Sequence, residues 1–183
     1  MFQDRYRGGA ARLAACGATL CLLVGAAVAL AAAAAPPPIA ARAAFDLLKQ
    51  LQGVWQGTAG DMPDQRVQYR VASGGSVVME TLFAGTPHEM ISMYHLDGED
   101  LVMTHYCSMG NQPRMRLDPG QSSPKHLSFV FTGGSNLKSD KDAHIHSGTI
   151  DLLDADHIDA AWTVYEGGRQ KDVKAFKLAR MKD

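Results

Sequence analysis

The sequence predicts an all-β protein, an antiparallel up-and-down β-barrel of about nine or ten strands with one short N-terminal helix. Three observations favour this fold class. Short apolar and β-branched segments recur along the chain after residue 52, and clusters containing Gly, Asp or Pro separate them. No second segment has the apolar period of an ordinary helix. Strands joined in sequence by tight turns favour a meander that closes on itself, and an open β-sandwich is the lesser alternative.

Residues 1–43 have the composition of a secretory signal peptide followed by a short linker. Three arginines precede an uncharged run rich in Ala, Leu and Val at 13–35, and prolines follow that run. A basic start, an apolar run and small residues at the cleavage site are typical of such signals. We therefore expect export to the periplasm or the extracellular space, cleavage after Ala35 or Ala43, and one domain over 44–183. The alternative is an uncleaved anchor, since the run is long enough to span a bilayer.

The charge and the cysteine content of the mature domain limit the kinds of partner and of stabilisation that the sequence allows. Acidic side chains outnumber basic ones after residue 44, which argues against a nucleic-acid partner. Without the anchor, we expect no membrane partner for the mature form. Cys107 is the one cysteine beyond the signal segment, because Cys16 and Cys21 lie within it. A domain without an internal disulfide depends on its apolar core, and we expect the single thiol to be buried.

The first half of the domain begins with a helix and continues with strands. Phe45, Leu48 and Leu51 recur at helical spacing and predict a helix over 43–52. Glycine-rich and Asp-Gly turns then separate segments that alternate or run apolar, as hairpin strands do. Strands are expected over 53–58, 67–72, 76–83, 88–96 and 101–109.

The second half continues the same pattern. Leu127, Phe129 and Phe131 are spaced two residues apart, which predicts a strand with one strongly apolar face. Residues 132–143 are polar and contain glycine, so we expect a loop that could act as a lid. The remaining strands are expected over 112–117, 127–131, 144–153, 157–165 and 172–181.

The stretch 103–114 concentrates the hydrogen-bonding side chains of the domain. Strand alternation places Met103, His105, Cys107 and Met109 on one side. A turn from Gly110 then brings two amides and an arginine close behind the strand. We interpret this stretch as the wall of a pocket inside the barrel.

The pocket is expected to hold a small apolar or amphipathic molecule, because small-molecule sites combine apolar walls with a few polar groups. The apolar wall is predicted to contain Phe83, Met90, Met103, Phe129, Phe131 and Trp162. The predicted ligand-binding residues are Glu80, Tyr94, His105, Cys107, Asn111, Gln112, Arg114 and Trp162. The alternative is that these polar groups form an internal structural network, since buried polar groups need partners.

Metal or haem binding is the second hypothesis. His144 and His146 are spaced so that both imidazoles point to one side of a strand, together with Gly148 and Ile150, and such a pair can share a zinc ion. His105 or Cys107 would supply a third ligand. Haem held by one histidine, or copper(I) on the methionine-rich face, are further alternatives, and no cofactor is assigned.

Catalysis is the third hypothesis, with His105 or Glu80 as the acid or base. The sequence contains no nucleophile elbow, phosphate-binding loop or paired-carboxylate motif. His105 and Cys107 share a strand face at about 7 Å, which is too far for direct proton transfer. A binding protein is therefore favoured over an enzyme.

The sequence Gly53-Val-Trp-Gln-Gly57 after a short amphipathic helix resembles the opening of lipocalin-like (calycin) barrels. The resemblance implies that the Trp55 indole packs against a basic side chain of the last strand, for which Arg180 is placed. The same motif resembles nitrobindin-like haem-binding barrels more weakly. The stretch from His88 to Arg114 also resembles a family of uncharacterised exported bacterial proteins, which implies no established activity.

Overall fold

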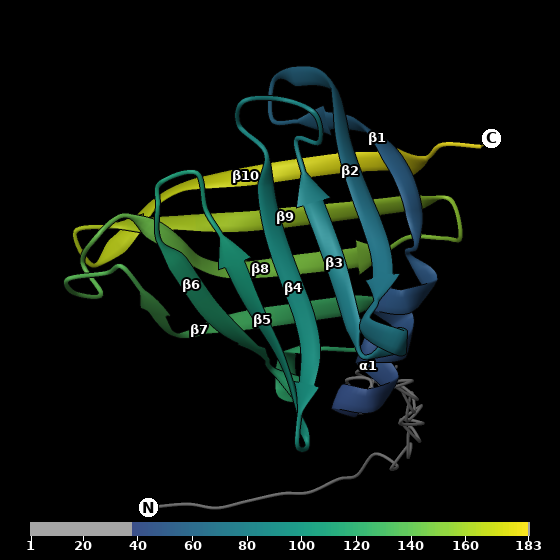
Figure 1. The fold of residues 1–183 in the computed structure, drawn as a ribbon, viewed down its shortest axis with the longest axis horizontal. Coiled ribbons are helices and arrows are strands. Elements are labelled where there is room, and N and C mark those ends of the chain that lie inside the picture. The colour runs from purple at the N-terminus through teal and green to yellow at the C-terminus, as the bar shows by residue number, and fades with distance from the viewer. Residues whose placement is uncertain (1–37, 183) are drawn as a thin grey trace, which may run out of the picture. The chain divides into compact units, whose positions relative to one another are not determined.

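The computed structural model describes residues 38–182, which contain ten antiparallel strands closed into a barrel and one α-helix. Each strand pairs with its neighbours in sequence, and β1 closes the barrel against β10 (Figure 1). The predicted fold class is therefore confirmed. The helix is α1 (Ala41–Gln50), and the strands are β1 (Gly53–Ala59), β2 (Met62–Ala72), β3 (Val77–Leu82), β4 (Met90–Asp97), β5 (Asp100–Tyr106), β6 (Gln112–Leu117), β7 (His126–Ser135), β8 (His144–Leu152), β9 (His157–Glu166) and β10 (Arg169–Arg180).

Several boundaries differ from those the sequence predicts, including the start of β2 and the ends of β5 and β7. β2 begins at Met62 rather than at residue 67, because the preceding exposed residues also pair with β1. β5 ends at Tyr106 rather than at residue 109, and a turn follows in which the Gly110 amide donates to the Cys107 carbonyl. β7 continues to Ser135, so the expected loop at 132–143 begins later. The predicted signal peptide lies outside the described residues, apart from 38–43.

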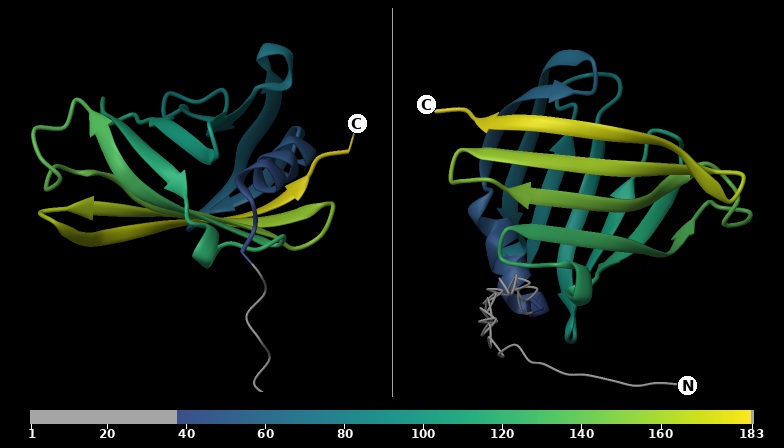
Figure 2. Two further views of the ribbon diagram at one scale, coloured as in Figure 1. Left: turned by 90° about the horizontal axis from the view of Figure 1, so that it is seen from below. Right: turned by 180° about the vertical axis from the view of Figure 1, so that it is seen from behind.

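The helix α1 packs on one end of the barrel beside β2, β4 and β5. Ala44, Phe45 and Leu48 are its buried residues, and they join the interior core of the strands. The loops 83–89, 107–111 and 136–143 lie away from α1, and we call this end of the barrel the loop end (Figures 1 and 2). Within 38–182, no helix has the length and hydropathy that a bilayer-spanning helix needs.

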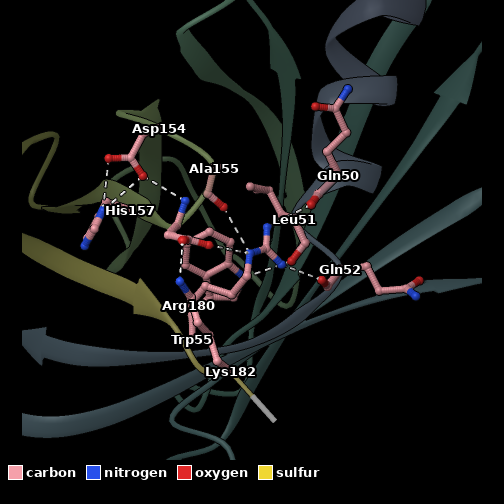
Figure 3. Close-up of polar contacts among 10 residues, drawn as sticks. Gln50, Leu51, Gln52, Trp55, Asp154, Ala155, His157, Arg180 and Lys182 are labelled. Atoms are coloured by element: carbon pink, nitrogen blue, oxygen red, sulfur yellow. Dashed lines mark hydrogen bonds and ion pairs between the residues drawn. The ribbon is translucent and has the colours of Figure 1, made fainter.

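Arg180 ties the end of β10 to α1 and β1. Its guanidinium lies 4.2 Å from the centre of the Trp55 ring, which is the contact that the sequence predicts (Figure 3). The same guanidinium donates to the carbonyls of Gln52 at 2.7 Å, Gln50 at 3.0 Å and Ala155 at 3.0 Å. The bond to Gln50 caps a carbonyl at the end of α1 that has no partner within the helix, while the bonds to Gln52 and Ala155 tie β10 to the segment before β1 and to the turn between β8 and β9.

We expect Arg180→Lys to lower the free energy of unfolding by about 1–2 kcal/mol, because an ammonium group cannot reproduce the three-way fork. Urea unfolding of both proteins measures the difference. Lys177→Ala, on an exposed position of the same strand, is the control and is expected to change stability by less than about 0.5 kcal/mol. Equal stability of the Arg180→Lys variant and the parent would show that the fork contributes nothing.

Candidate functional site

The strand register places four polar side chains in one row across the inside of the barrel. Tyr69 on β2 lies opposite Glu80 on β3, Glu80 lies opposite Ser92 on β4, and Ser92 lies opposite His105 on β5. All four are buried. Strand side chains alternate between faces, so this row lies on the same face as buried core residues such as Met103.

Glu80 is the best-satisfied member of this row. The Tyr69 hydroxyl donates to one carboxyl oxygen at 2.7 Å, and the Tyr94 hydroxyl donates to the other at 2.8 Å. Burial raises the pKa of Glu80 above its ordinary value, while hydrogen bonds from Tyr69, Tyr94 and Ser92 act in the opposite direction. The carboxyl group is thus surrounded by hydroxyl donors that suit its charged form.

His105 is held by one nitrogen only. Its Nδ1 atom lies 3.0 Å from the Ser92 hydroxyl oxygen. Its Nε2 atom is buried and has no hydrogen-bonding partner among the described residues. Burial lowers the pKa of His105 from 6.5 to about 4, because the imidazolium form would lose its hydration. The imidazole is therefore neutral at physiological pH, with one nitrogen carrying a proton and the other accepting.

Trp162 on β9 lies next to His105, with 6.4 Å between the ring centres and 20° between the ring planes. Its Nε1 atom is also buried without a partner in residues 38–182. The indole occupies space that Gly148 leaves on β8, because a Cβ atom at position 148 would lie 2.0 Å from the ring. Gly148 and Trp162 are opposite each other in the register, so the two residues fit as a pair.

We expect Gly148→Ala to lower the free energy of unfolding by about 2 kcal/mol, because the added methyl group forces the Trp162 ring out of place. The near-ultraviolet circular dichroism of the indole should change as well. Ser147→Ala, one residue away, is the control and is expected to leave both unchanged. An unaltered stability for Gly148→Ala would show that the ring is not fixed by this contact.

Several predicted pocket residues line the interior or the loop end. Met103 and Phe129 are buried, and the Phe129 ring lies 5.5 Å from that of Tyr94. Phe83 at the loop end packs against Phe176 at 5.5 Å. Met90 lies beside Cys107, whose sulfur is 3.9 Å away. These contacts show an interior lined by apolar and aromatic side chains.

The amides expected to orient a ligand lie at the loop end. Asn111 is buried, and its Nδ2 atom donates to the Ala143 carbonyl at 2.7 Å, while its Oδ1 atom has no partner within 38–182. Gln112 donates to the Gly110 carbonyl at 3.2 Å. Gln112 Oε1 also accepts from Asn136 Nδ2 at 3.1 Å, so both amides connect the turn after β5 with the loop before β8 and have a structural part in the loop end.

The expected inward position is wrong for three residues of the stretch 103–114. Arg114 is exposed, because Pro113 and Met115 occupy the inward positions of β6 and the arginine alternates outward. Met109 is exposed too, and Cys107 is half-buried in the turn, because β5 has already ended and strand alternation no longer applies to them. Of the four residues predicted to share one side of the strand, only Met103 and His105 are buried in the barrel.

The predicted histidine pair does meet, but without further ligands. His144 Nε2 lies 3.0 Å from His146 Nδ1, and His144 Nδ1 lies 2.7 Å from the Asp142 carbonyl. A β-bulge between Ile145 and Ser147 interrupts the alternation, so the pair does not share one regular face with Gly148 and Ile150 as expected. Among residues 38–182, no three His, Cys, Asp or Glu side chains are grouped to hold a metal ion.

Two clefts lie apart from the buried row. One of about 560 Å³ lies between residues 38–42 and the turn after β4. Another of about 260 Å³ lies between the side chains of His95, Arg114 and Thr132 on the outside of the sheet. Neither is lined by Glu80 or its hydrogen-bonding partners.

Sequence reasoning missed Tyr69 and Ser92, which complete the row. Tyr69 alternates with Val67 and Val71, so its inward position could have been found from the period of β2. Ser92 sits between Ile91 and Met93, and its importance follows from the register, which the sequence does not reveal.

The closed ten-strand antiparallel barrel with one short helix fits a lipocalin-like fold. No family model matches the sequence, and no curated protein matches it either. The fold and the buried row therefore define the class of this protein: a β-barrel with a row of polar side chains in its interior.

Proposed function

We propose that this chain is an exported small-molecule-binding protein that holds a largely apolar ligand inside the barrel. The observation that carries this proposal is the pair of unpartnered nitrogen atoms, His105 Nε2 and Trp162 Nε1, in an apolar interior. A buried polar atom without a partner costs about 1–3 kcal/mol. A polar group of a bound ligand removes that cost.

A purely structural network explains Glu80 but not this pair. Glu80 has its oxygens satisfied by two tyrosine hydroxyls, as a structural network requires. His105 and Trp162 present unsatisfied nitrogen atoms instead, where leucine or phenylalanine would fill the same space without that cost. Sites for small molecules combine apolar walls with a few polar groups of this kind.

Ligand entry requires side chains to move, because the two nitrogen atoms are buried, and the proposal places this movement at the loop end. Phe83 is a candidate for this movement. Its backbone has a φ of 55°, which is unusual for a bulky residue, and it begins the loop 83–89. Its ring covers Phe176 at the loop end. Strained residues of this kind concentrate at ligand clamps and switch regions.

Export and membership of the lipocalin-like barrels belong to the same proposal. Export is supported by the basic start and the apolar run at 13–35. The lipocalin-like assignment is supported by the stacking of Arg180 on Trp55. Mass spectrometry of the protein recovered from its native compartment tests export, since cleavage within residues 35–43 is expected and an intact N-terminus would contradict it.

Toluene binding tests the proposed function directly. The chain has two tryptophans, so Trp55→Phe leaves Trp162 as the sole fluorescent reporter beside the site. We expect toluene to change the emission of this variant saturably, and to leave the Trp162→Phe variant, which reports on Trp55 only, unchanged. Circular dichroism first establishes that both variants are folded. A native mass spectrum of purified protein with a bound organic molecule would support the same conclusion, and a protein that binds neither toluene nor its hydroxylated analogue phenol would contradict it.

A further inference from the structure

We propose that the site recognises an uncharged hydroxyl group on its ligand, which accepts from Trp162 Nε1 and donates to His105 Nε2. This inference rests on the proposed function and specifies the chemical class of the ligand. It follows from whether each of the two nitrogen atoms can donate or accept a hydrogen bond in its surroundings.

Trp162 determines what kind of ligand atom can lie beside its indole nitrogen. An indole N–H group donates and cannot accept. Because this group is buried and has no partner in the described part of the chain, the ligand atom beside it has to be an acceptor. A hydrocarbon leaves the donor unsatisfied, and an ammonium group presents a second donor to it.

The Glu80 carboxylate determines, through Ser92, which nitrogen of His105 carries the proton. Both carboxyl oxygens of Glu80 accept from tyrosine hydroxyl groups, as a carboxylate does, and Ser92 lies directly opposite Glu80 in the strand register. A Ser92 hydroxyl that donates to Glu80 uses its oxygen to accept from His105 Nδ1, 3.0 Å away. The proton of the neutral imidazole then lies on Nδ1, and Nε2 is left as an acceptor that needs a donor.

The charges of the interior exclude an anionic ligand. No lysine or arginine is buried among residues 38–182, so a ligand carboxylate would have no cation to pair with. It would also lie in the same buried region as Glu80, where like charges repel strongly. A ketone would satisfy Trp162 but leave His105 Nε2 without a donor.

A hydroxyl group meets both requirements, since its oxygen accepts while its proton is donated. The two rings are neighbours, with centres 6.4 Å apart, and the proposal places one small polar group against both nitrogen atoms. Aromatic and apolar side chains, including Tyr94, Phe129 and Met103, line the rest of the interior. A phenol or a short alcohol has this combination of an apolar body and one hydroxyl group.

The test compares phenol, toluene and benzoate by calorimetry at neutral pH. Phenol and toluene have nearly the same shape, so the difference between them isolates the hydroxyl group. We expect phenol to bind about tenfold more tightly than toluene, which corresponds to one net buried hydrogen bond. Benzoate is expected to bind at least about tenfold more weakly than phenol, because it adds an unpaired buried charge.

Trp162→Phe is expected to remove the preference for phenol over toluene while toluene still binds. Trp55→Phe, at the far end of the barrel, is the matched control and should retain the preference. Toluene binding as tight as phenol binding, or benzoate binding as tight as either, would overturn this inference and leave the proposed function intact. Failure of all three compounds to bind would overturn both. The comparison in the parent protein decides the inference even if Trp162→Phe does not fold.

Discussion

Glu80→Ala is expected to lower the free energy of unfolding by about 4 kcal/mol. The substitution removes the acceptor for two buried tyrosine hydroxyls, and each unsatisfied hydroxyl costs about 1–3 kcal/mol. It also leaves a cavity where the carboxyl group and its side-chain carbons lay. Equilibrium urea unfolding at neutral pH measures the change, provided that the denaturant dependence of both proteins is the same.

Two controls separate this mechanism from a general effect of removing charge. Glu80→Gln keeps an acceptor oxygen and the side-chain volume, so we expect a smaller loss of about 1–2 kcal/mol. Glu99→Ala lies on an exposed turn and should change stability by less than about 0.5 kcal/mol. A loss below about 1 kcal/mol for Glu80→Ala would show that the tyrosine hydroxyls do not depend on this carboxyl group.

Acidification is expected to destabilise the protein through His105. The pKa of His105 is about 4 in the folded protein and 6.5 ordinarily, so the unfolded chain binds a proton first. The stability that the neutral imidazole contributes is present above pH 6.5 and is lost as the pH falls through about 4. The full loss is about 3 kcal/mol.

His105→Gln isolates this contribution, because glutamine does not titrate. The difference in unfolding free energy between parent and variant should shrink between pH 6.5 and 4. Glu80 has the opposite sign: its pKa is raised in the folded protein, so its contribution is lost as the pH rises. Subtracting the two profiles of unfolding free energy against pH cancels the contributions of Glu80 and His146, because both residues are present in both proteins. Parallel profiles would show that His105 is not buried in its neutral form.

The fold was predictable because two local signals agree along the whole domain. Alternating apolar segments and tight turns recur from Gly53 to Arg180, and adjacent strands joined by turns leave few topologies other than a meander. The closing contact of Trp55 and Arg180 was also predictable, from the resemblance of the first strand. The start of β2 was not, because residues 62–66 have no apolar alternation and adopt the strand conformation through pairing with β1.

The candidate site was predictable only in part. Glu80, Tyr94, His105 and Trp162 were expected in the pocket, and the structure brings them into the interior. Arg114 was misplaced because the sequence shows that it is near the turn but not which face β6 turns inward. The row from Tyr69 to His105 depends on the register of four strands, and a shift of one residue would turn any member outward.

The most direct test of the binding site is a nitrogen–proton correlation spectrum of the two indole N–H groups, recorded while phenol is added. The Trp55→Phe variant assigns the two signals. The Trp162 signal is predicted to shift progressively and saturably, while the Trp55 signal, whose N–H donates to the Leu51 carbonyl at 2.8 Å, stays in place. An unmoved Trp162 signal under saturating phenol would contradict a ligand site inside the barrel.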